Sequence, residues 1–283
     1  MDLSIVIVNF NTRDLLKNCL TSIFKQRGVE YEVWVVDNAS RDGSAQMVEK
    51  DFTQVKLIKN KENLGFAKGN NLALRQAQSK YLFLLNPDTI VKEGSLSKLV
   101  DFLEKNPQAG AVGAKILNPD GSLQSSVGKF YDLGSVSLML FGGERAGFLR
   151  SSPSKMGEVD WVSGAALAVR KEVFENVGGL DENFFMYMEE VEWCYRIRKA
   201  GFKIFFYPEV EIVHYERASG SKSQAIWGIY QGLILFFQKH KPPWQVIILR
   251  ALLKTKAALA LIIGFLTGND YLKTTYIKAF SLI

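Results

Sequence analysis

The sequence has little cysteine and histidine, with two residues of each type among its 283 residues. Cys19 and Cys194 provide no disulfide framework, and this cysteine usage suits a reducing compartment. The sequence contains neither a Gly-x-Gly-x-x-Gly fingerprint nor a Walker A phosphate loop. Hydride transfer and nucleoside triphosphate hydrolysis therefore have no support.

Long apolar runs and a signal peptide are also lacking. The first residues, 1–6, have no basic segment and no small-residue cleavage site. No stretch reaches the roughly 18–20 apolar residues that a membrane-spanning helix needs. The composition, 47% hydrophobic and 23% charged, excludes a disordered or collagen-like chain, and the length suits one large domain or two small ones.

The formal net charge of +6 is unevenly distributed. Eight of the 35 basic residues lie from Ala218 onward, but only one of the 29 acidic residues, Asp270, does. The preceding residues carry 27 basic and 28 acidic side chains, whereas the C-terminal segment has a net charge of +7. Because the excess belongs to this segment, we expect no nucleic-acid partner.

Short apolar runs alternate with helical patterns over the first ninety residues. The strand-like runs are Leu3–Val8, Tyr31–Val36, Val55–Ile58 and Tyr81–Leu85, and the helical patterns cover 15–23, Ala45–Asp51 and Asn71–Ala77. This alternation predicts an α/β protein with a mostly parallel central sheet flanked by helices.

Three predicted strands end in Asn or Asp, at Asn9, at Asp37-Asn38 and at Asn86-Pro87-Asp88. Ligands of parallel sheets bind beyond the carboxyl ends of the strands. Helix capping and turn formation explain any one of these ends equally well. Their recurrence favours a polar ligand site.

Several of these segments have chemistry suited to a nucleotide. A carboxylate such as Asp37 can accept the imide N–H of a pyrimidine, and the helix N-terminus that follows favours phosphate. The loop 63–71 offers amide side chains and backbone N–H groups, although a glycine-rich turn explains it too. Asp88 can hold a divalent metal across a diphosphate, with a plain turn as the alternative.

The middle of the chain changes character. Ser125–Lys155 is rich in Gly and Ser, which predicts a long, mobile loop. Order returns at Val159, and the later elements are a helix from Lys171 to Gly178, a helix from about Glu189, and strands at Ile204–Tyr207 and Glu211–Val213.

The helix that begins near Glu189 carries three glutamates in its first turn, Glu189, Glu190 and Glu192. Capping does not need so many carboxylates, and the helix dipole would keep one ionised, as a general base requires. His214 ends the last predicted strand. A lone histidine is more often structural, but its strand-end position makes it a metal-ligand candidate.

The C-terminal segment has basic, aromatic and apolar character. Ser223–Gln238 is uncharged, and Val246–Leu266 is apolar apart from Arg250, Lys254 and Lys256. Helices of this kind, too short to span, suit a membrane interface. The alternative is that they pack on the sheet or on a second subunit in a homodimer.

These motifs together resemble the inverting family-2 nucleotide-sugar glycosyltransferases of the GT-A fold, in particular a bacterial rhamnosyltransferase-like branch that acts in polysaccharide assembly. The matching segments are Ser4–Asn11, Val36–Ser44, Glu62–Asn71, Leu84–Thr89, Trp161–Arg170 and 178–215. The resemblance implies a GT-A catalytic domain over residues 1–217, with a nucleotide-binding half (1–117) and an acceptor and catalytic half (158–217). A helical tail (218–283) follows and contacts the membrane interface or a second subunit.

The resemblance also implies roles for the matching residues. Asp37 binds the uracil or thymine base, and the remaining nucleotide-binding residues are Asn9, Asn38, Asn63, Gly65, Asn71 and Asn86. Asp88 is the expected ligand of Mg²⁺ or Mn²⁺, and His214 completes the metal site. Asn86 replaces the first aspartate of the family's metal motif.

The implied catalytic base is Glu190, which stands where the family has an aspartate, with Glu189 beside it. Trp161, Ser163, Gly164 and Glu192 are expected on the acceptor and donor-sugar side, with the loop 125–157 closing over bound donor. The implied reaction is a single displacement that inverts the sugar of dTDP-rhamnose or a UDP-sugar. The metal and helix N-termini stabilise the departing diphosphate.

The expected acceptor is a lipid-linked saccharide, and the expected location is cytoplasmic, at the inner face of the bacterial membrane. No Gln-x-x-Arg-Trp motif follows the base, which indicates transfer of one sugar rather than polymerisation. Two other functions remain open. A sugar-phosphate nucleotidyltransferase would need a Gly-rich basic loop that residues 10–13 do not supply. The Asn86 and Glu190 departures leave open an inactive nucleotide-sugar-binding module.

Overall fold

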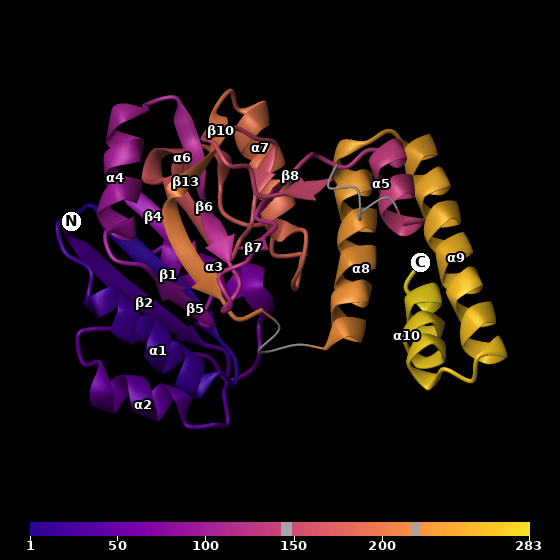
Figure 1. Ribbon diagram of the computed structural model, residues 1–283, viewed down its shortest axis with the longest axis horizontal. Helices are drawn as coiled ribbons and strands as arrows, with labels where there is room; N and C mark the ends of the chain where they lie inside the picture. Colours follow the sequence, from indigo (N-terminus) through magenta and orange to yellow (C-terminus); the bar gives the residue numbers. More distant parts are fainter. Residues whose placement is uncertain (143–148, 217–220) are drawn as a thin grey trace.

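The computed structural model describes residues 1–142, 149–216 and 221–283. Within these residues a large mixed sheet forms the centre of the molecule (Figure 1). Its main path runs through β10 (Gly157–Glu158), β13 (Lys203–His214), β6 (Ala109–Leu117), β12 (Ala166–Arg170), β4 (Tyr81–Leu85), β1 (Leu3–Asn9), β2 (Tyr31–Asp37) and β3 (Lys56–Lys59). Two short strands pair off this path, β5 (Thr89–Val91) with β13 and β7 (Leu123–Gln124) with β6.

The predicted parallel part of the sheet is confirmed. β1 pairs in parallel with β2 and with β4, and β2 pairs in parallel with β3. Nearly every residue of β1 and β4 is buried, which explains their continuous apolar sequences. The register places Asn9 directly opposite Asp37, so the carboxyl ends of these strands lie side by side.

The last strand differs from the sequence-based expectation. The two short strands predicted at 204–207 and 211–213 form one strand, β13, whose register against β6 shifts between Tyr207 and Glu211. Pro208 lies within this shift, and proline has no N–H for the ladder. The bulge therefore interrupts the apolar pattern without ending the strand, which carries His214 to the edge that Thr89 occupies.

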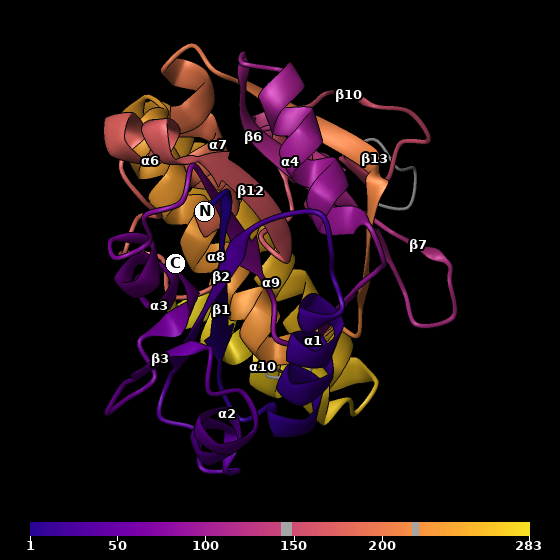
Figure 2. The ribbon, with the colours of Figure 1, turned by 90° about the vertical axis from the view of Figure 1, so that its left-hand side faces the viewer.

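Helices cover both faces of the sheet (Figure 2). One apolar cluster packs α1 (Arg13–Phe24), α2 (Ser44–Asp51) and α4 (Ser95–Lys105) on the first face. A second cluster packs α3 (Gly65–Leu74), α6 (Lys171–Val177) and α7 (Glu189–Lys199) on the other. α3 begins before the predicted Asn71, because the Asn63 side chain accepts a hydrogen bond from the Gly65 N–H and turns the chain there.

The prediction of a long loop between residues 125 and 157 was wrong for the part of this segment that the structure describes. Residues 143–148 lie outside the described residues. β8 (Val127–Gly128), β9 (Arg150–Ser151) and β11 (Trp161–Val162) form a small antiparallel sheet. α5 (Leu133–Leu140) starts at a capping box between Asp132 and Ser135. Strands of two residues are too short to produce a periodic apolar pattern.

Three helices complete the chain, α8 (Lys222–His240), α9 (Pro243–Leu266) and α10 (Asp270–Ser281). They lie beside the sheet domain together with α5 (Figure 1). None of the helices in the three described ranges combines the length and the apolarity that crossing a bilayer requires. The division at 217/218 falls at residues 217–220, which lie outside the described residues. α8 buries Leu233, Phe236 and Phe237 in the same cluster as α7.

Candidate active site

The carboxyl ends of β1 and β2 form a buried polar cluster. The Asn9 amide donates to an Asp37 carboxylate oxygen (2.9 Å) and to the Ser40 hydroxyl (3.0 Å). The other Asp37 oxygen accepts the Ser40 backbone N–H (3.0 Å), and the Thr12 hydroxyl donates to Asn9 (2.6 Å). These bonds fix the orientation of the Asp37 carboxylate at the strand end.

A second cluster of amides continues from β2 to α3. The Asn38 amide donates to the Asn63 side chain (3.2 Å) and the Gly65 carbonyl (3.1 Å), and its oxygen accepts from Asn60 (2.8 Å). Ser40 and Asn60 were not selected from the sequence. Each is one of several polar residues in its turn, and only the bond of Ser40 to Asn9 and the bond of Asn60 to Asn38 distinguish them.

A third cluster lies at the end of β4. His214 Nε2 is 3.3 Å from an Asp88 carboxylate oxygen and 3.3 Å from the Asn86 amide nitrogen. The other ring nitrogen, Nδ1, is 2.7 Å from the Gln124 side-chain oxygen, and the Gln124 amide donates to Asn118 (3.0 Å). Gln124 was missed in the sequence because it lies on a strand of two residues, just before the segment expected to be a loop, where no periodic pattern marks it.

This cluster fits a divalent cation whose coordination a substrate completes. Within the described ranges, no three His, Cys, Asp or Glu side chains are grouped as a metal site would require. Asp88 and His214 nevertheless supply one oxygen and one nitrogen, both buried. Mg²⁺ and Mn²⁺ in phosphate-binding enzymes are commonly held by one or two protein side chains together with phosphate oxygens and water. The donor set therefore fits such an ion.

The segment that precedes α7 contacts the loop 63–71, at the start of α3. The Phe66 backbone N–H donates to the Phe185 carbonyl (2.7 Å). Gly65 has a φ of +79°, and any side chain there would collide with that carbonyl and the Phe185 ring. Gly164 lies against Phe66 and Glu190, since a Cβ at Gly164 would be 3.4 Å from the Phe66 ring and 3.5 Å from the Glu190 Cβ.

Glu189 and Glu190 are adjacent carboxylates with different exposure. Glu189 is 4% exposed, whereas Glu190 is half-buried, and each has an Oε2 atom without a hydrogen-bond partner. Burial and the neighbouring Glu190 raise the pKa of Glu189 well above its usual range. Burial also raises the pKa of Glu190, while the Arg150 guanidinium acts to lower it. Arg150 lies over the Trp161 ring, 5.3 Å from its centroid.

Three predicted site residues use their side chains within the protein. The Asn71 amide donates to the Leu180 carbonyl (2.8 Å) and accepts the Leu180 N–H (3.0 Å). Glu192 is fully buried and bonded to Arg196, Lys239 and His240. The Trp161 indole donates to a backbone carbonyl (2.9 Å). Ser163, which lies between Trp161 and Gly164 in the sequence, is half-buried.

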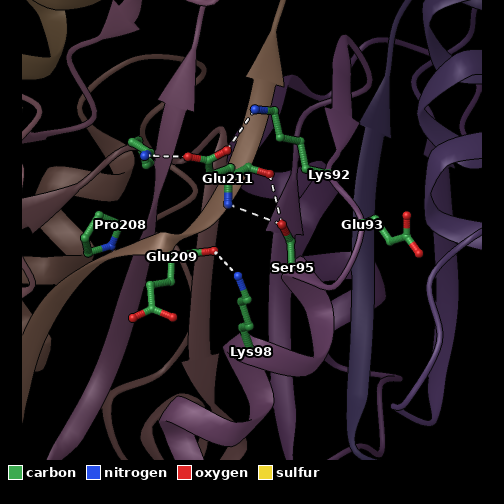
Figure 3. A pocket seen from close by; sticks show the side chains of 8 residues that line it. Lys92, Glu93, Ser95, Lys98, Pro208, Glu209 and Glu211 are labelled. Atoms are coloured by element: carbon green, nitrogen blue, oxygen red, sulfur yellow. Dashed lines mark hydrogen bonds and ion pairs between the residues drawn. The ribbon is translucent and has the colours of Figure 1, made fainter.

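Two hollows lie away from the strand ends that carry the predicted site residues. One, of about 390 Å³, contains Lys92, Lys115 and Glu211, but the Glu211 carboxylate already pairs with both lysines (Figure 3). The other, of about 370 Å³, lies between the ends of α5, α9 and α10 and is mainly apolar, with Leu259 and Ile263 in its wall. None of the predicted site residues lines either hollow.

The sheet order, the crossing helices and the polar strand ends define a glycosyltransferase of the GT-A fold. The chain belongs to glycosyl transferase family 2, whose model matches residues 4–178. This membership sets aside the nucleotidyltransferase alternative.

Among its relatives is the N-acetylglucosaminyl-diphospho-decaprenol L-rhamnosyltransferase of Mycobacterium tuberculosis, 29% identical over 79% of this chain and 79% of that protein. The rhamnosyltransferase WbbL of Escherichia coli is 32% identical over 53% of this chain and 61% of its own length.

Solved structures share the fold. A mannosyltransferase from Pyrobaculum calidifontis in complex with GDP-Man and Mn²⁺ has a TM-score of 0.59 and 19% identity, covering 99% of this chain and 85% of that one. GalNAc-T7 with UDP, GalNAc and Mn²⁺ has a TM-score of 0.64 and 18% identity, and the match covers 84% of this chain but 48% of GalNAc-T7.

Proposed function

We propose that this glycosyltransferase moves one sugar, with inversion, from dTDP-rhamnose or a UDP-sugar to a lipid-linked saccharide in cell-surface polysaccharide synthesis. The observation that carries the proposal is a chain of contacts that runs from the Asp88–His214 pair, through Asn86 and the segment 164–165, to Glu190. The link between them is short, because the Asn86 N–H donates to the Ala165 carbonyl (3.1 Å) and Gly164 lies against Glu190.

The donor would bind along the strand ends. The fixed carboxylate of Asp37 accepts the imide N–H of uracil or thymine, and Asn9 holds that carboxylate in position. Asn38, Asn63 and Gly65 shape the adjacent wall. Asn71 serves to attach α3 to the segment around Leu180, so we assign it a structural role.

Asp88 and His214 would hold Mg²⁺ or Mn²⁺. Such an ion, when bound, supplies positive charge that stabilises the departing diphosphate. Asn86, beside His214, is placed to donate a hydrogen bond to a phosphate oxygen. The dipole of α3, which begins at Gly65, adds positive potential on the same side, although the Gly65 and Phe66 N–H groups already donate to Asn63 and Phe185.

Glu190 would act as the general base. Of the two adjacent glutamates it is the more exposed, and the Arg150 guanidinium favours its ionised form. Its carboxylate accepts the proton of an acceptor hydroxyl as that hydroxyl attacks the anomeric carbon opposite the diphosphate. Gly164 packs against Glu190 and the Phe66 ring, so its lack of a side chain permits this close approach. Glu189 is less suited to the role of base, because burial and the neighbouring Glu190 raise its pKa well above the usual range and so favour its protonated form.

The Mycobacterium tuberculosis relative, whose name gives a decaprenol-linked acceptor, supports a membrane-associated acceptor for this chain. The C-terminal helices expose a group of large apolar side chains beside lysines, which suits the surface of an anionic bilayer. The exposed apolar residues are Trp244, Ile247, Ile248, Leu259, Ile262, Ile263, Phe265, Leu266, Ile277 and Phe280. A homodimer contact through the same face is the competing arrangement.

The test is a panel of nucleotide sugars with Mn²⁺, assayed with a short-chain prenyl diphosphate N-acetylglucosamine as acceptor. Glu190→Gln should lower kcat by about 10²–10⁴, the usual contribution of a general base, while donor affinity measured by calorimetry is retained. The anomeric configuration of the product, measured by NMR, should be opposite to that of the donor.

Glu93→Gln is the matched control, because Glu93 is exposed and lines a hollow that contains none of the predicted site residues. It should transfer sugar at the wild-type rate. Full activity of Glu190→Gln would refute the base assignment. A wild-type chain that binds donor and releases no nucleotide with any acceptor would support the inactive binding module.

A further inference from the structure

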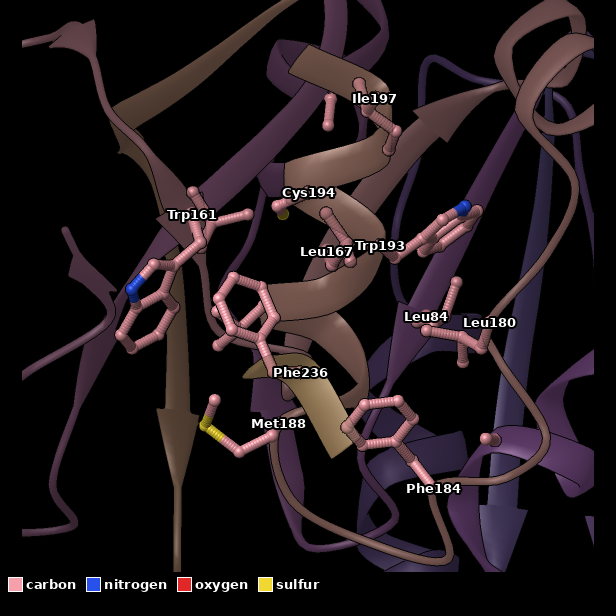
Figure 4. Close-up of a cluster of buried hydrophobic side chains, with 14 of the residues drawn as sticks. Leu84, Trp161, Leu167, Leu180, Phe184, Met188, Trp193, Cys194, Ile197 and Phe236 are labelled. Atoms are coloured by element: carbon pink, nitrogen blue, oxygen red, sulfur yellow. The ribbon is translucent and has the colours of Figure 1, made fainter. Parts of the chain in front are cut away.

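One row of residues on α8, spaced four apart, lies along the catalytic helix α7 and the segment before it. The row consists of Gly228, Gly232, Phe236 and His240. The Phe236 ring is edge-on to Tyr195 of α7, with centroids 5.2 Å apart, and the His240 ring is 4.6 Å from the same tyrosine. Phe236 shares an apolar cluster with Met188 and Trp193 (Figure 4).

The two glycines of this row bring α8 into direct contact with the backbone just before Glu189. A Cβ at Gly228 would lie 2.6 Å from the Tyr187 ring and 2.8 Å from the Met186 carbonyl oxygen. A Cβ at Gly232 would lie 2.7 Å from the Met188 Cβ and 2.9 Å from the Tyr187 carbonyl oxygen. No larger residue fits either position without displacing that backbone.

The backbone that α8 contacts is strained. Tyr187 and Met188 both have positive φ angles, +74° and +76°, a conformation that non-glycine residues adopt only at an energetic cost. Such residues persist when their surroundings hold them there. Met188 is 3% exposed and is the N-cap residue of α7. The backbone conformation of Tyr187 and Met188 therefore sets the position at which α7 starts, and with it the positions of Glu189 and Glu190.

An ionic cluster holds α7 and α8 together one turn beyond the glutamates. The buried Glu192 carboxylate accepts from Lys239 Nζ (2.6 Å), lies 3.0 Å from His240 Nε2, and accepts from Arg196 Nε (2.8 Å). Lys239 also donates to Asp181 (2.6 Å). Two separate contacts, apolar at the glycines and ionic at Glu192, therefore fix α7 relative to α8.

We propose that α8 positions the catalytic base: its Gly228–Gly232 face holds Tyr187 and Met188 in their left-handed conformation, and its Lys239–His240 end holds Glu192. The proposal rests on the assignment of Glu190 as the base. It makes α8 part of the catalytic unit rather than of the membrane-facing tail, and it gives Glu192 a positioning role instead of the predicted place on the acceptor side.

The first test replaces Gly228 or Gly232 by Ala in the full chain. Each new Cβ has to displace the strained segment, so kcat should fall at least about tenfold while the affinity for UDP with Mn²⁺ stays within about twofold. Gly264→Ala is the matched control. It also removes a glycine from a tight helix contact, with a Cβ 3.0 Å from the Leu272 Cβ and 3.2 Å from the Lys273 nitrogen, but that contact lies between α9 and α10. It should keep the wild-type kcat.

A second pair of variants tests the ionic end and does not add volume to the core. Lys239→Met should lower kcat severalfold with UDP affinity retained, and Lys239→Arg should restore most of the rate, because Lys239 is partly exposed and its loss leaves the apolar core intact. Hydrogen exchange of the segment 184–190 should increase in Gly232→Ala and in Lys239→Met, and not in Gly264→Ala.

Unchanged kcat and unchanged exchange in Gly228→Ala, Gly232→Ala and Lys239→Met would overturn the proposal. So would a parallel loss of kcat and UDP affinity in all variants, Gly264→Ala included. Glu190→Gln separates the two hypotheses. If that variant is inactive and the α8 variants are normal, the positioning role fails and the proposed function stands. If that variant is active, the base assignment fails, and hydrogen exchange alone decides whether α8 holds the segment.

Discussion

His214 Nε2 lies 3.3 Å from a carboxylate oxygen of Asp88, at the junction of the last strand with the turn after β4. The contact of the other ring nitrogen, Nδ1, indicates how the imidazole is held. Gln124 donates its amide to Asn118 and presents its oxygen to His214 Nδ1 at 2.7 Å. In this network Nδ1 therefore donates to Gln124, and Nε2 is the ring nitrogen that faces Asp88 and the Asn86 amide.

The first prediction concerns Gln124. Gln124→Ala should lower Mn²⁺ affinity, measured by calorimetry in the presence of UDP, by about 10–100-fold, because a group that orients a histidine ligand typically contributes this much. Gln108→Ala, at an exposed glutamine, is the control and should bind Mn²⁺ normally. Equal Mn²⁺ affinity of Gln124→Ala and wild type would show that His214 needs no orientation.

The sequence predicted the nucleotide-side half of the fold well, for a physical reason. β1, β2 and β4 are buried on both faces, so each is a continuous apolar run with a sharp polar end. Parallel pairing then requires those ends to meet, and the register of Asn9 with Asp37 follows. Residues adjacent to such strands, including Asp88, can be selected without any knowledge of long-range contacts.

The rest of the site depends on contacts that leave no local pattern. Gln124 lies on a strand of two residues, and its partner His214 is far away in the sequence, on β13. Nothing in the sequence around Gly232 indicates its close contact with Met188, which only the structure shows. Glu192 looked like a third acidic residue of a first turn, whereas burial beside Lys239 makes it a link between helices.

The second prediction concerns the pH dependence of the rate. Burial raises the pKa of Glu190, and a base works only when deprotonated, so the acid limb of the kcat/KM profile should lie above the usual titration range of a glutamate. Arg150→Met removes a cation that acts to lower this pKa, so its acid limb should move to higher pH. Arg150→Lys keeps the charge and should move it less. An unshifted profile in Arg150→Met would contradict this electrostatic role.

The third prediction concerns stability and Glu189. Its raised pKa means that the folded chain keeps a proton which the unfolded chain loses as the pH rises above the usual glutamate range. The contribution of Glu189 to the free energy of unfolding should therefore be fully present below the usual glutamate range and should fall as the pH rises above that range, by at most about 1.4 kcal/mol per unit for one proton. Glu189→Gln cannot ionise, so its denaturation midpoint should depend less on pH. Identical pH dependence in variant and wild type would contradict a protonated Glu189.

The fourth prediction concerns the exposed apolar side chains of the C-terminal helices. Ile262 and Leu266 are one turn apart on α9 and are 55% and 82% exposed. Burying an apolar side chain contributes about 1.5–3 kcal/mol, so Ile262→Ser with Leu266→Ser should lower partitioning into anionic liposomes by at least about tenfold. A higher salt concentration should weaken the liposome binding of the wild type and of the double variant alike.

The control for this experiment is Met156→Ser. Met156 is 53% exposed but lies in the catalytic domain, so partitioning should not change. Sedimentation of the same proteins distinguishes the competing arrangement. If the wild type is a dimer that Ile262→Ser with Leu266→Ser dissociates, and liposome binding is the same in both, this face contacts a second subunit and not a bilayer. A monomer whose partitioning depends on Ile262, Leu266 and anionic lipid supports the membrane interface.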